Sequence, residues 1–383
     1  MGGWKLLLTT PSFGAKSVLK SMSLLKLIVK EKVIINFIMK FNTIFKIILC
    51  NIKLWSKRYL FIPFNIVPYK VQINLTNRCN SRCDYCHIWK IDNFEDEIDL
   101  EHISSFFKDI NDGLIWLVLG GGEVTVVKYI EKAIIVAKES CPNLRIISFT
   151  TNALLPKKAL EIALMIKQAG FEPLVTISLD GDREQHDQIR GVKGNYDKCI
   201  RLYQMLKENL IEVNYGITVS GENKDFIINN YRSMRHQIKA VTFVHSGGIY
   251  KKTNKPEISD IYSSLLFIYK NYVLDSIAEL IELIHIKIAV LFVKNGQRSN
   301  IIPCEVIDTS LHIKENGDIQ PCMFLEPIGN IKTENIRDVL QTDAVSELKK
   351  RIKKDQCPHC WMNCYSIYSI MAHPFRSIFY LLK

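Results

Sequence analysis

The chain has 383 residues, of which 48% are hydrophobic and 23% charged, with only 12 Pro and 18 Gly. These values exclude a disordered, collagenous or low-complexity protein and allow one large packed domain with a small appendage. The net charge of +11 comes from residues 1–70, which hold 12 Lys and Arg but one acid, Glu31, so the remaining chain is neutral and no nucleic-acid partner is expected.

Residues 1–65 combine this basic charge with Leu, Ile, Phe and Trp, and we expect them to form amphipathic helices. Lysines interrupt every apolar run before it reaches the roughly 18 to 20 residues of a membrane-spanning helix, and Leu6–Leu8 is too short for a secretory signal. A cytoplasmic protein is therefore expected. Two interpretations of the segment stay open: peripheral docking on a membrane surface, or a helical pair packed on the main domain.

From about residue 70, short β-branched runs alternate with longer amphipathic stretches. The expected strands are Val71–Leu75, Ile115–Leu119, Arg145–Phe149, Leu174–Leu179, Val213–Val219 and Ala240–Val244. The expected helices are Leu100–Ile110, Val127–Lys138, Lys157–Ala169, Asn195–Asn209 and Phe226–Gln237. This alternation predicts an α/β fold, a partial (β/α)6 TIM-like barrel over residues 66–250, with reactive groups after the carboxyl ends of its strands.

Three cysteines, Cys79, Cys83 and Cys86, follow the first expected strand with Cys-x-x-x-Cys-x-x-Cys spacing. Clustered thiols in a cytosolic chain indicate a metal or iron–sulfur site rather than disulfides. Three thiolates can hold three corners of a cubane cluster and leave the fourth iron open to a ligand. Structural zinc is the alternative, and His87 is the only nearby candidate for its fourth ligand.

Glycine-rich or polar segments follow the next three strands. Gly120-Gly121-Gly122-Glu123 permits a ligand to approach backbone N–H groups and offers an acid to a ligand ammonium, with a plain tight turn as the alternative. Thr150-Thr151-Asn152 follows the third strand. Ser178-Leu179-Asp180-Gly181 follows the fourth and leads to His186 and Arg190. The hydroxyls of Ser178 and Thr151 either bind a ligand or cap a helix.

The remaining chain is expected to comprise a helical connector at 251–300, with a helical stretch over Ile258–Val293, a Cys-rich segment at 301–366 and a hydrophobic tail at 367–383. The Cys-rich segment reads Cys304-x12-Gly317-x4-Cys322 and then Cys357-x2-Cys360-x3-Cys364, with an expected hairpin turn at Gly317. Its thiolates suit either an iron–sulfur cluster or a zinc ribbon. The separate Cys50, Cys141 and Cys199 are expected to be small buried hydrophobes.

The spacing of Cys79, Cys83 and Cys86, with Tyr85 before the last Cys, resembles the radical S-adenosylmethionine superfamily. The segments after strands two, three and four agree with that family's pattern, except that Val124 stands where the family usually has Pro. The second cysteine group resembles the SPASM and twitch extensions, which carry auxiliary [4Fe–4S] clusters.

The resemblance implies that Cys79, Cys83 and Cys86 hold a catalytic [4Fe–4S] cluster, which binds S-adenosylmethionine and cleaves it reductively to a 5′-deoxyadenosyl radical. A flavodoxin- or ferredoxin-type reductant would supply the electron. The implied cofactor contacts are Tyr85, Gly121, Gly122, Glu123, Thr151, Asn152, Ser178, Asp180 and Arg190.

The resemblance also implies one auxiliary [4Fe–4S] cluster, because this chain has five cysteines where the two-cluster extension has seven. Its simplest ligands are Cys304, Cys322, Cys357 and Cys360, with Cys364 either spare or replacing one of them.

No residue identifies the substrate. The sequence slightly favours a small molecule or a lipid over a peptide, because nothing in it resembles the separate peptide-binding module of many peptide-modifying members. His245, Gly247 and Gly248, after the sixth strand, are expected either to face the substrate cavity or to form a solvated turn. A peptide-modifying maturase and a non-catalytic iron–sulfur electron carrier remain the alternative functions.

Overall fold

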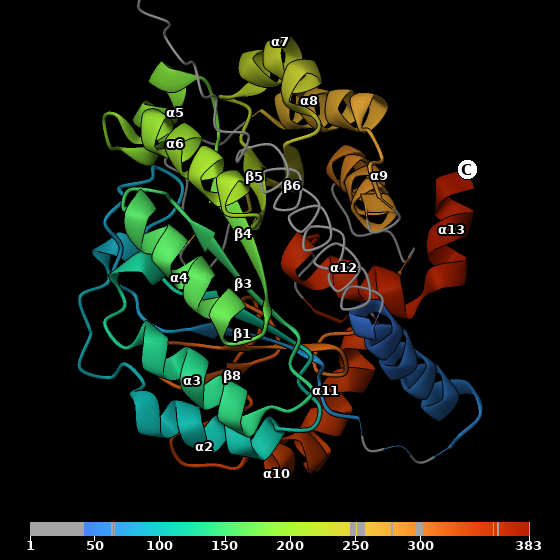
Figure 1. Cartoon of the computed structure of the whole chain (residues 1–383). Coiled ribbons are helices and arrows are strands. Elements are labelled where there is room, and N and C mark those ends of the chain that lie inside the picture. Colours follow the sequence, from blue (N-terminus) through green and yellow to red (C-terminus); the bar gives the residue numbers. More distant parts are fainter. Residues whose placement is uncertain are drawn as a thin grey trace, which may run out of the picture. The chain divides into compact units, whose positions relative to one another are not determined.

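A computed structural model of the chain describes residues 42–62, 64, 66–245, 250, 257–276, 279–295, 302–354, 356–357 and 360–382. The chain divides into two compact units, Met1–Leu49 and Cys50–Lys383. The second unit contains the sheet and every site discussed below (Figure 1). Residues 1–41, Gly247 and Gly248 lie outside the described residues, so the predictions made for them stay predictions.

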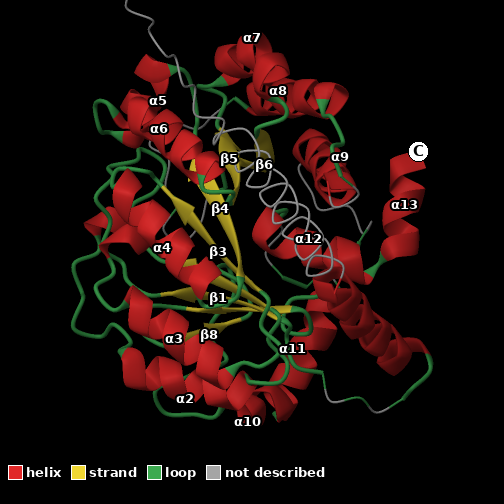
Figure 2. Ribbon diagram, in the orientation of Figure 1, coloured by secondary structure: helices red, strands yellow, loops and turns green. Residues whose placement is uncertain are grey.

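The described strands form one sheet in the order β6-β5-β4-β3-β2-β1-β7-β8-β9 (Figure 2). The strands are β1 (Lys70–Asn74), β2 (Trp116–Gly120), β3 (Ile146–Thr151), β4 (Glu172–Ser178), β5 (Glu212–Val219), β6 (Ile238–Phe243), β7 (Ser310–Ile313), β8 (Asp318–Gln320) and β9 (Gly329–Asn330). Strands β1 to β6 pair in parallel, which confirms the predicted α/β fold with a parallel sheet.

Helices follow the strands as predicted, with ends shifted by a few residues, and a further helix at Arg183–Arg190 was not predicted. The first half of the sheet carries α2 (Leu100–Ile110), α3 (Ile130–Ser140), α4 (Pro156–Gln168), α5 (Arg183–Arg190), α6 (Asn195–Glu208) and α7 (Lys224–Met234). Alternate strand residues such as Val71, Ile73 and Leu117 are fully buried against the helical side chains Ile103 and Phe107. This alternation leaves the other face of each strand free for polar side chains.

The predicted helical stretch over Ile258–Val293 is divided in the structure into α8 (Ile258–Asn271) and α9 (Glu279–Asn295). Tyr272, the C-cap of α8, is already extended. Lys239 Nζ on β6 bonds the carbonyl of Val273 at 3.3 Å, so a group that would accept an intrahelical hydrogen bond is satisfied by another element. The hydrophobic periodicity of the sequence does not reveal such a tertiary contact, so the break between α8 and α9 was not predicted.

The Cys-rich end is more regular than its sequence suggests. Strand β7 pairs in parallel with β1 and so extends the barrel sheet, while β7 and β8 form the predicted hairpin, with Gly317 at a φ of 91°. The helices that follow are α10 (Ile336–Gln341), α11 (Asp343–Lys353), α12 (Asn363–Ala372) and α13 (Pro374–Leu382). The extension is therefore continuous with the barrel sheet.

Residues 42–59 are helical, and those from Cys50 onward belong to the second unit. Within that unit Leu54 is buried, and Arg58 donates to the buried Glu305 at 2.5 Å. Among the described helices, none has both the length and the hydropathy that crossing a bilayer requires.

Glu282 on α9 is a buried carboxyl whose replacement should change the pH dependence of stability. Burial raises its pKa to about 8, although its Oε1 accepts a hydrogen bond from Val241 N at 2.9 Å. A folded-state pKa above the unfolded value means that stability is full below about pH 4.5 and falls as the pH rises toward 8. We expect Glu282→Gln to raise the free energy of unfolding by about 2 kcal/mol at pH 9 and to change it little at pH 5.

Urea unfolding at the two pH values measures this difference. Glu279→Gln, a half-buried acid on the same helix that pairs with Lys239, is the matched control. A gain at pH 5 equal to the gain at pH 9 would contradict the assignment of Glu282 as the titrating group.

Candidate active site

The loop after β1 carries Cys79, Cys83 and Cys86, and it is fastened to the end of α5. Arg82 N donates to Arg190 O at 3.0 Å, and Asp84 N donates to Ile189 O at 3.1 Å. Ser81 Oγ also donates to Arg190 O, at 2.9 Å. Two backbone bonds and one side-chain bond thus position the cysteine loop against a helix more than one hundred residues further along the chain.

The glycine run after β2 packs directly beneath the entry to this loop. Gly122 N donates to Thr76 O at 2.7 Å, and Glu123 N donates to Arg78 O at 2.9 Å. A Cβ on Gly121 would stand 2.3 Å from Thr76 O, and one on Gly122 would stand 2.2 Å from Arg78 O. The glycines are therefore needed for backbone-to-backbone contact, whereas the sequence interpretation assigned them to the approach of a ligand.

Gly122→Ala should consequently disturb the cysteine loop. Because the nearest atoms are backbone, the loop must move, and we expect a loss of about 2 kcal/mol in unfolding free energy and a clear drop in iron bound after reconstitution. Gly170→Ala is the control, since no atom lies within 4 Å of the added methyl and only its φ of 94° is unfavourable. Equal iron content in the two variants would show that the contact is unimportant.

Glu123 cross-links the ends of β2 and β3. Its buried carboxylate accepts from Thr151 Oγ1 at 2.7 Å, Asn152 N at 2.9 Å and Thr125 Oγ1 at 2.8 Å. Burial raises the pKa of Glu123, and these hydrogen bonds oppose the rise. The contact of this acid with a ligand ammonium stays a prediction: Oε1 accepts from Thr125 and Thr151, whereas Oε2 accepts one hydrogen bond and keeps a further acceptor position.

Asn152 connects this carboxylate to the cysteine loop. Its Nδ2 donates to Asn80 Oδ1 at 2.8 Å and lies 3.9 Å from Cys79 Sγ. Glu123 and Thr151 thus place Asn152, and Asn152 contacts the loop at its first cysteine. Glu123 and Asn152, which were predicted separately at the ends of two strands, are thus hydrogen-bonded to each other.

A second network surrounds Cys83. Arg190 Nη2 pairs with Asp180 Oδ2 at 2.6 Å, Tyr85 OH donates to the same oxygen at 2.8 Å, and Arg190 Nη1 lies 3.7 Å from Cys83 Sγ. Asp180 is fully buried, and its Oδ1 also accepts from Thr218 N at 2.9 Å. Burial alone would lower the pKa of Arg190, but the Asp180 charge raises it well above the ordinary value. A permanent positive charge is therefore held beside the second cysteine.

Asp180 is supported by His186, which was named from the sequence, and through it by Asn195, which sequence reasoning missed. His186 Nδ1 accepts from Asp180 N at 3.1 Å, and its Nε2 is 3.2 Å from Asn195 Oδ1. Burial lowers the pKa of His186 to about 4, so the ring is neutral and has one donor and one acceptor nitrogen. Asn195 Nδ2 in turn donates to Asn152 O at 2.7 Å, which joins the two networks.

Cys199 also belongs to this support. Its Sγ lies 3.6 Å from the carbonyl of Ser178 and 3.8 Å from that of Asn152, and burial raises its pKa to about 12. Cys199 and Cys141 are both buried, as predicted for small hydrophobes, but Cys199 faces the site. Ser178 joins the network through its backbone carbonyl rather than through its hydroxyl.

Two of the loop thiols are held as neutral thiols in the metal-free fold. Burial raises the pKa of Cys79 and of Cys86 to about 11, so both are neutral thiols until a metal displaces the proton. Within the described residues, no three Cys, His, Asp or Glu side chains converge closely enough to form a ready-made metal site. The loop therefore provides the donors on a fastened backbone, and metal binding would have to draw the side chains together.

In the second cysteine group, buried Cys322 lies near Cys304 and Cys357, and burial raises its pKa to about 12. Cys364 lies instead beside Lys70 of β1, whose Nζ is 3.4 Å from the Cys364 carbonyl. Burial lowers the pKa of Lys70 to about 8. The structure thus associates three of the four cysteines of the simplest ligand set and places Cys364 toward the barrel strand.

His245, after β6, is half-buried with its Nε2 atom out of contact with solvent, and burial lowers its pKa to about 4. Its ring lies 4.3 Å from that of Phe243 and 6.2 Å from that of Phe324, measured between centroids. The choice between a cavity-facing position and a turn stays a prediction, because residues 246–249 lie outside the described residues.

Two family models match the chain. The model of the radical SAM superfamily, in which SAM is S-adenosylmethionine, matches residues 73–231, and that of the SPASM iron–sulfur cluster-binding domain matches residues 304–365. The first match contains the cysteine loop and both networks, and the second contains all five later cysteines.

Individual proteins of known function are more distant. The chain is 23% identical over 324 residues to the sporulation killing factor maturation protein SkfB of Bacillus subtilis, covering 79% of this chain and 74% of SkfB. It is 26% identical over 323 residues to a GTP 3′,8-cyclase of Helicobacter pylori, covering 76% of this chain and 94% of the cyclase.

Among solved structures, anSMEcpe with bound AdoMet and Cp18Cys peptide has a similar fold. The TM-score is 0.54 at 18% identity, and the match covers 82% of this chain and 97% of that one. At this identity the likeness establishes the fold alone.

Proposed function

This chain belongs to the radical SAM superfamily and carries a C-terminal SPASM iron–sulfur domain, and from that premise we propose that it is a maturase that modifies a peptide. The observation that carries the proposal is the similarity to SkfB, a maturation protein, along most of both chains. This reverses the preference of the sequence interpretation for a small molecule or lipid.

When bound, the [4Fe–4S] cluster and S-adenosylmethionine supply a 5′-deoxyadenosyl radical that removes a hydrogen atom from the substrate. The residues of this chain have the tasks of binding and positioning. Cys79, Cys83 and Cys86 would hold the cluster, Arg190 would place positive charge beside Cys83, and Asn152 would support the loop at Cys79.

The roles of the other predicted contacts follow from their geometry. Tyr85 and Asp180 would fix the Arg190 guanidinium, whereas Glu123 and Thr151 would position Asn152. Gly121 and Gly122 would allow the start of the cysteine loop to pack directly against the backbone after β2. The Ser178 hydroxyl is the predicted contact that is free to meet a ligand oxygen, since Ser178 joins the networks through its carbonyl.

Polar groups on one face of the sheet support a polar substrate over a lipid. By register, Asn74, Asn214, Thr242 and His312 lie on the face opposite to that covered by α2, α3, α4 and α6. Each has a buried side-chain atom with no hydrogen-bond partner among the described residues. Such atoms are costly in an apolar environment and favourable when a substrate amide or hydroxyl pairs with them.

We further propose that the SPASM domain holds one auxiliary [4Fe–4S] cluster through Cys304, Cys322, Cys357 and Cys360. The proximity of Cys322 to Cys304 and Cys357 supports this set, and Cys364, which neighbours Tyr365 as Cys322 and Cys360 do, is the alternative ligand. The flavodoxin- or ferredoxin-type reductant stays a prediction.

The proposal can be tested with deuterated material. An extract of source cells grown in deuterated medium is incubated anaerobically with the reconstituted protein, S-adenosylmethionine and dithionite, and 5′-deoxyadenosine is examined by mass spectrometry. Deuterium should appear in 5′-deoxyadenosine and should disappear when the extract is first treated with a protease. Transfer from a protease-resistant fraction would instead identify a small-molecule substrate, as in the cyclase.

A further inference from the structure

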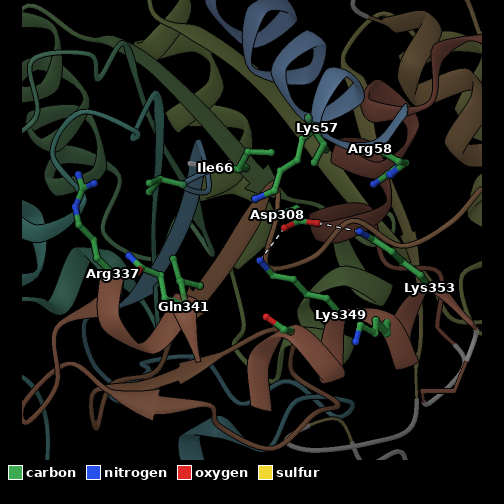
Figure 3. Close-up of a pocket in the computed structure, with 13 residues that line it drawn as sticks. Lys57, Arg58, Ile66, Asp308, Arg337, Gln341, Lys349 and Lys353 are labelled. Carbon is green, nitrogen blue, oxygen red and sulfur yellow. Dashed lines mark hydrogen bonds and ion pairs between the residues drawn. The ribbon is translucent and has the colours of Figure 1, made fainter. Parts of the chain in front are cut away.

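A cationic cavity lies at the end of the barrel opposite to the cysteine loop. Ile66 and Val67, which line it, precede β1, whereas Cys79 follows β1, so the cavity is at the amino ends of the strands. Its volume is about 520 Å³. Six basic side chains line the cavity together with one acid, Asp308 (Figure 3); they are Lys57, Arg58, Arg337, Lys349, Lys350 and Lys353.

The single acid does not neutralise this cavity. Asp308 lies at its centre and pairs with Lys349 at 2.8 Å and with Lys353 at 3.2 Å, as Figure 3 shows. Lys57 is exposed and makes no ion pair within the described residues, and Lys350 is paired only with the exposed Glu347 at 3.4 Å. Arg58 and Arg337 pair with Glu305 and Asp112, which do not line the cavity, so the excess positive charge at the opening comes from the lysines, and it suits a phosphate group.

The helix that supplies Lys57 and Arg58 to the cavity also carries exposed apolar side chains. Trp55 and Tyr59 are about half exposed, and Phe61 follows with 86% of its surface in solvent and a φ of 55°. Phe375 and Leu382 of α13 are 79% and 81% exposed. Such an exposed set of aromatic and aliphatic side chains is typical of a surface that binds a membrane or another protein.

A buried cluster brings the two apolar segments together. Arg58 Nη2 donates to Glu305 Oε2 at 2.5 Å, and Arg58 Nη1 is 3.2 Å from His373 Nε2, at the residue before α13. His373 Nε2 is also 2.7 Å from Glu305 Oε1. Residues 50–62 and 374–382 are therefore joined at one point, and neither range contains an acid.

We propose that residues 50–61 and α13 dock this chain on an anionic phospholipid bilayer, with a lipid phosphate entering the cationic cavity. Charge complementarity and the aromatic side chains carry this choice of occupant. An acidic peptide would satisfy the lysines but would leave Trp55, Phe61 and Phe375 in water. The inference is independent of the substrate, because the cavity is at the opposite end of the barrel from the cysteines.

The test is flotation of the full chain with phosphatidylcholine vesicles that contain about 30% phosphatidylglycerol, against phosphatidylcholine alone. All variants keep residues 1–49, so differences report on the second unit. Lys57→Glu with Lys350→Glu should weaken binding at least about tenfold, because two positive charges near the lipid surface become negative and the net charge falls by four units. Lys132→Glu with Lys138→Glu, an exposed pair on α3, makes the same charge change and should leave binding unchanged.

The apolar part is tested in the same way. Phe61→Ser should weaken flotation about fivefold, since an aromatic ring no longer enters the interface. Leu210→Ser is its matched control, because Leu210 is also exposed and also has a positive φ, of 54°, but lies on the α6–β5 loop. Formation of 5′-deoxyadenosine in solution should be the same in all these variants, which shows that they fold.

Free glycerol phosphate separates the sources of phosphate. It should compete with vesicles only weakly, because it lacks the apolar contacts. Flotation that is unaffected by the lysine reversals overturns the proposal. Tight binding of poly-glutamate or of free glycerol phosphate to a chain that does not float also overturns it, in favour of an acidic peptide or a soluble phosphate compound.

Discussion

Replacing Cys83 by Ala is expected to reduce 5′-deoxyadenosine formation at least about a thousandfold, equivalent to about 4 kcal/mol in the reaction barrier. Three thiolates hold three of the four irons of a cubane cluster and leave one iron open. Loss of one thiolate therefore weakens binding of the cluster, and without the cluster no electron reaches the sulfonium. Cys83 is also the thiol beside Arg190, at 3.7 Å, and the nearest side-chain oxygen, Ser81 Oγ at 3.3 Å from Cys83 Sγ, is a hydroxyl that is a weaker iron ligand than a thiolate. Anaerobic reconstitution followed by iron analysis and chromatography measures both effects.

Two cysteine controls make this result specific. Cys141→Ala removes a thiol that is equally buried but whose one hydrogen bond among the described residues is to the carbonyl of Phe107, at 3.7 Å, and should retain activity. Cys322→Ala should lower the iron content by the amount that the auxiliary cluster holds, while 5′-deoxyadenosine still forms. Full iron and turnover in the Cys83 variant would remove the basis for the assignment of the catalytic cluster.

Replacing Asp180 by Asn is expected to lower the free energy of unfolding by about 3–5 kcal/mol, because the Arg190 charge is then buried without its partner. Activity should fall as well, since Arg190 also holds the cysteine loop through its carbonyl. Urea unfolding of the protein before reconstitution measures the stability term without the contribution of bound iron.

A double-variant cycle separates the ion pair from the shape of the side chains. Asp180→Asn combined with Arg190→Gln should be more stable than Asp180→Asn alone, with a coupling of at least about 2 kcal/mol. Asp197→Asn breaks an exposed pair with Arg183 and should have no measurable effect. Additive losses in the cycle would show that Asp180 and Arg190 do not depend on each other.

The sequence by itself determined the parts that depend on neighbouring residues. Period-two and period-3.6 patterns located β1 to β6 and α2, α3, α4, α6 and α7 within a few residues, because burial of one face is encoded locally. The spacing of Cys79, Cys83 and Cys86 also predicted the family, because one loop supplies all three donors and their spacing can be read directly from the sequence.

The partners of buried polar groups were decided by the tertiary structure. No local pattern shows that Glu123 accepts from Thr151 and Asn152, or that Asp180 pairs with Arg190 while His186 supports it. A carboxylate removed from water must find donors, and the fold determines which donors are within reach.

The same reason explains why the pairing of the extension with the barrel sheet was not predicted. Strand β7 lies in a segment with little periodicity, and it becomes a strand because the edge of β1 offers unpaired backbone groups to it. The position of Cys364 beside Lys70 and the joining of residues 50–62 to α13 through Arg58 likewise depend on contacts between distant parts of the chain. Local sequence thus determined which elements form and which thiols share a loop, whereas only packing decided which charges meet.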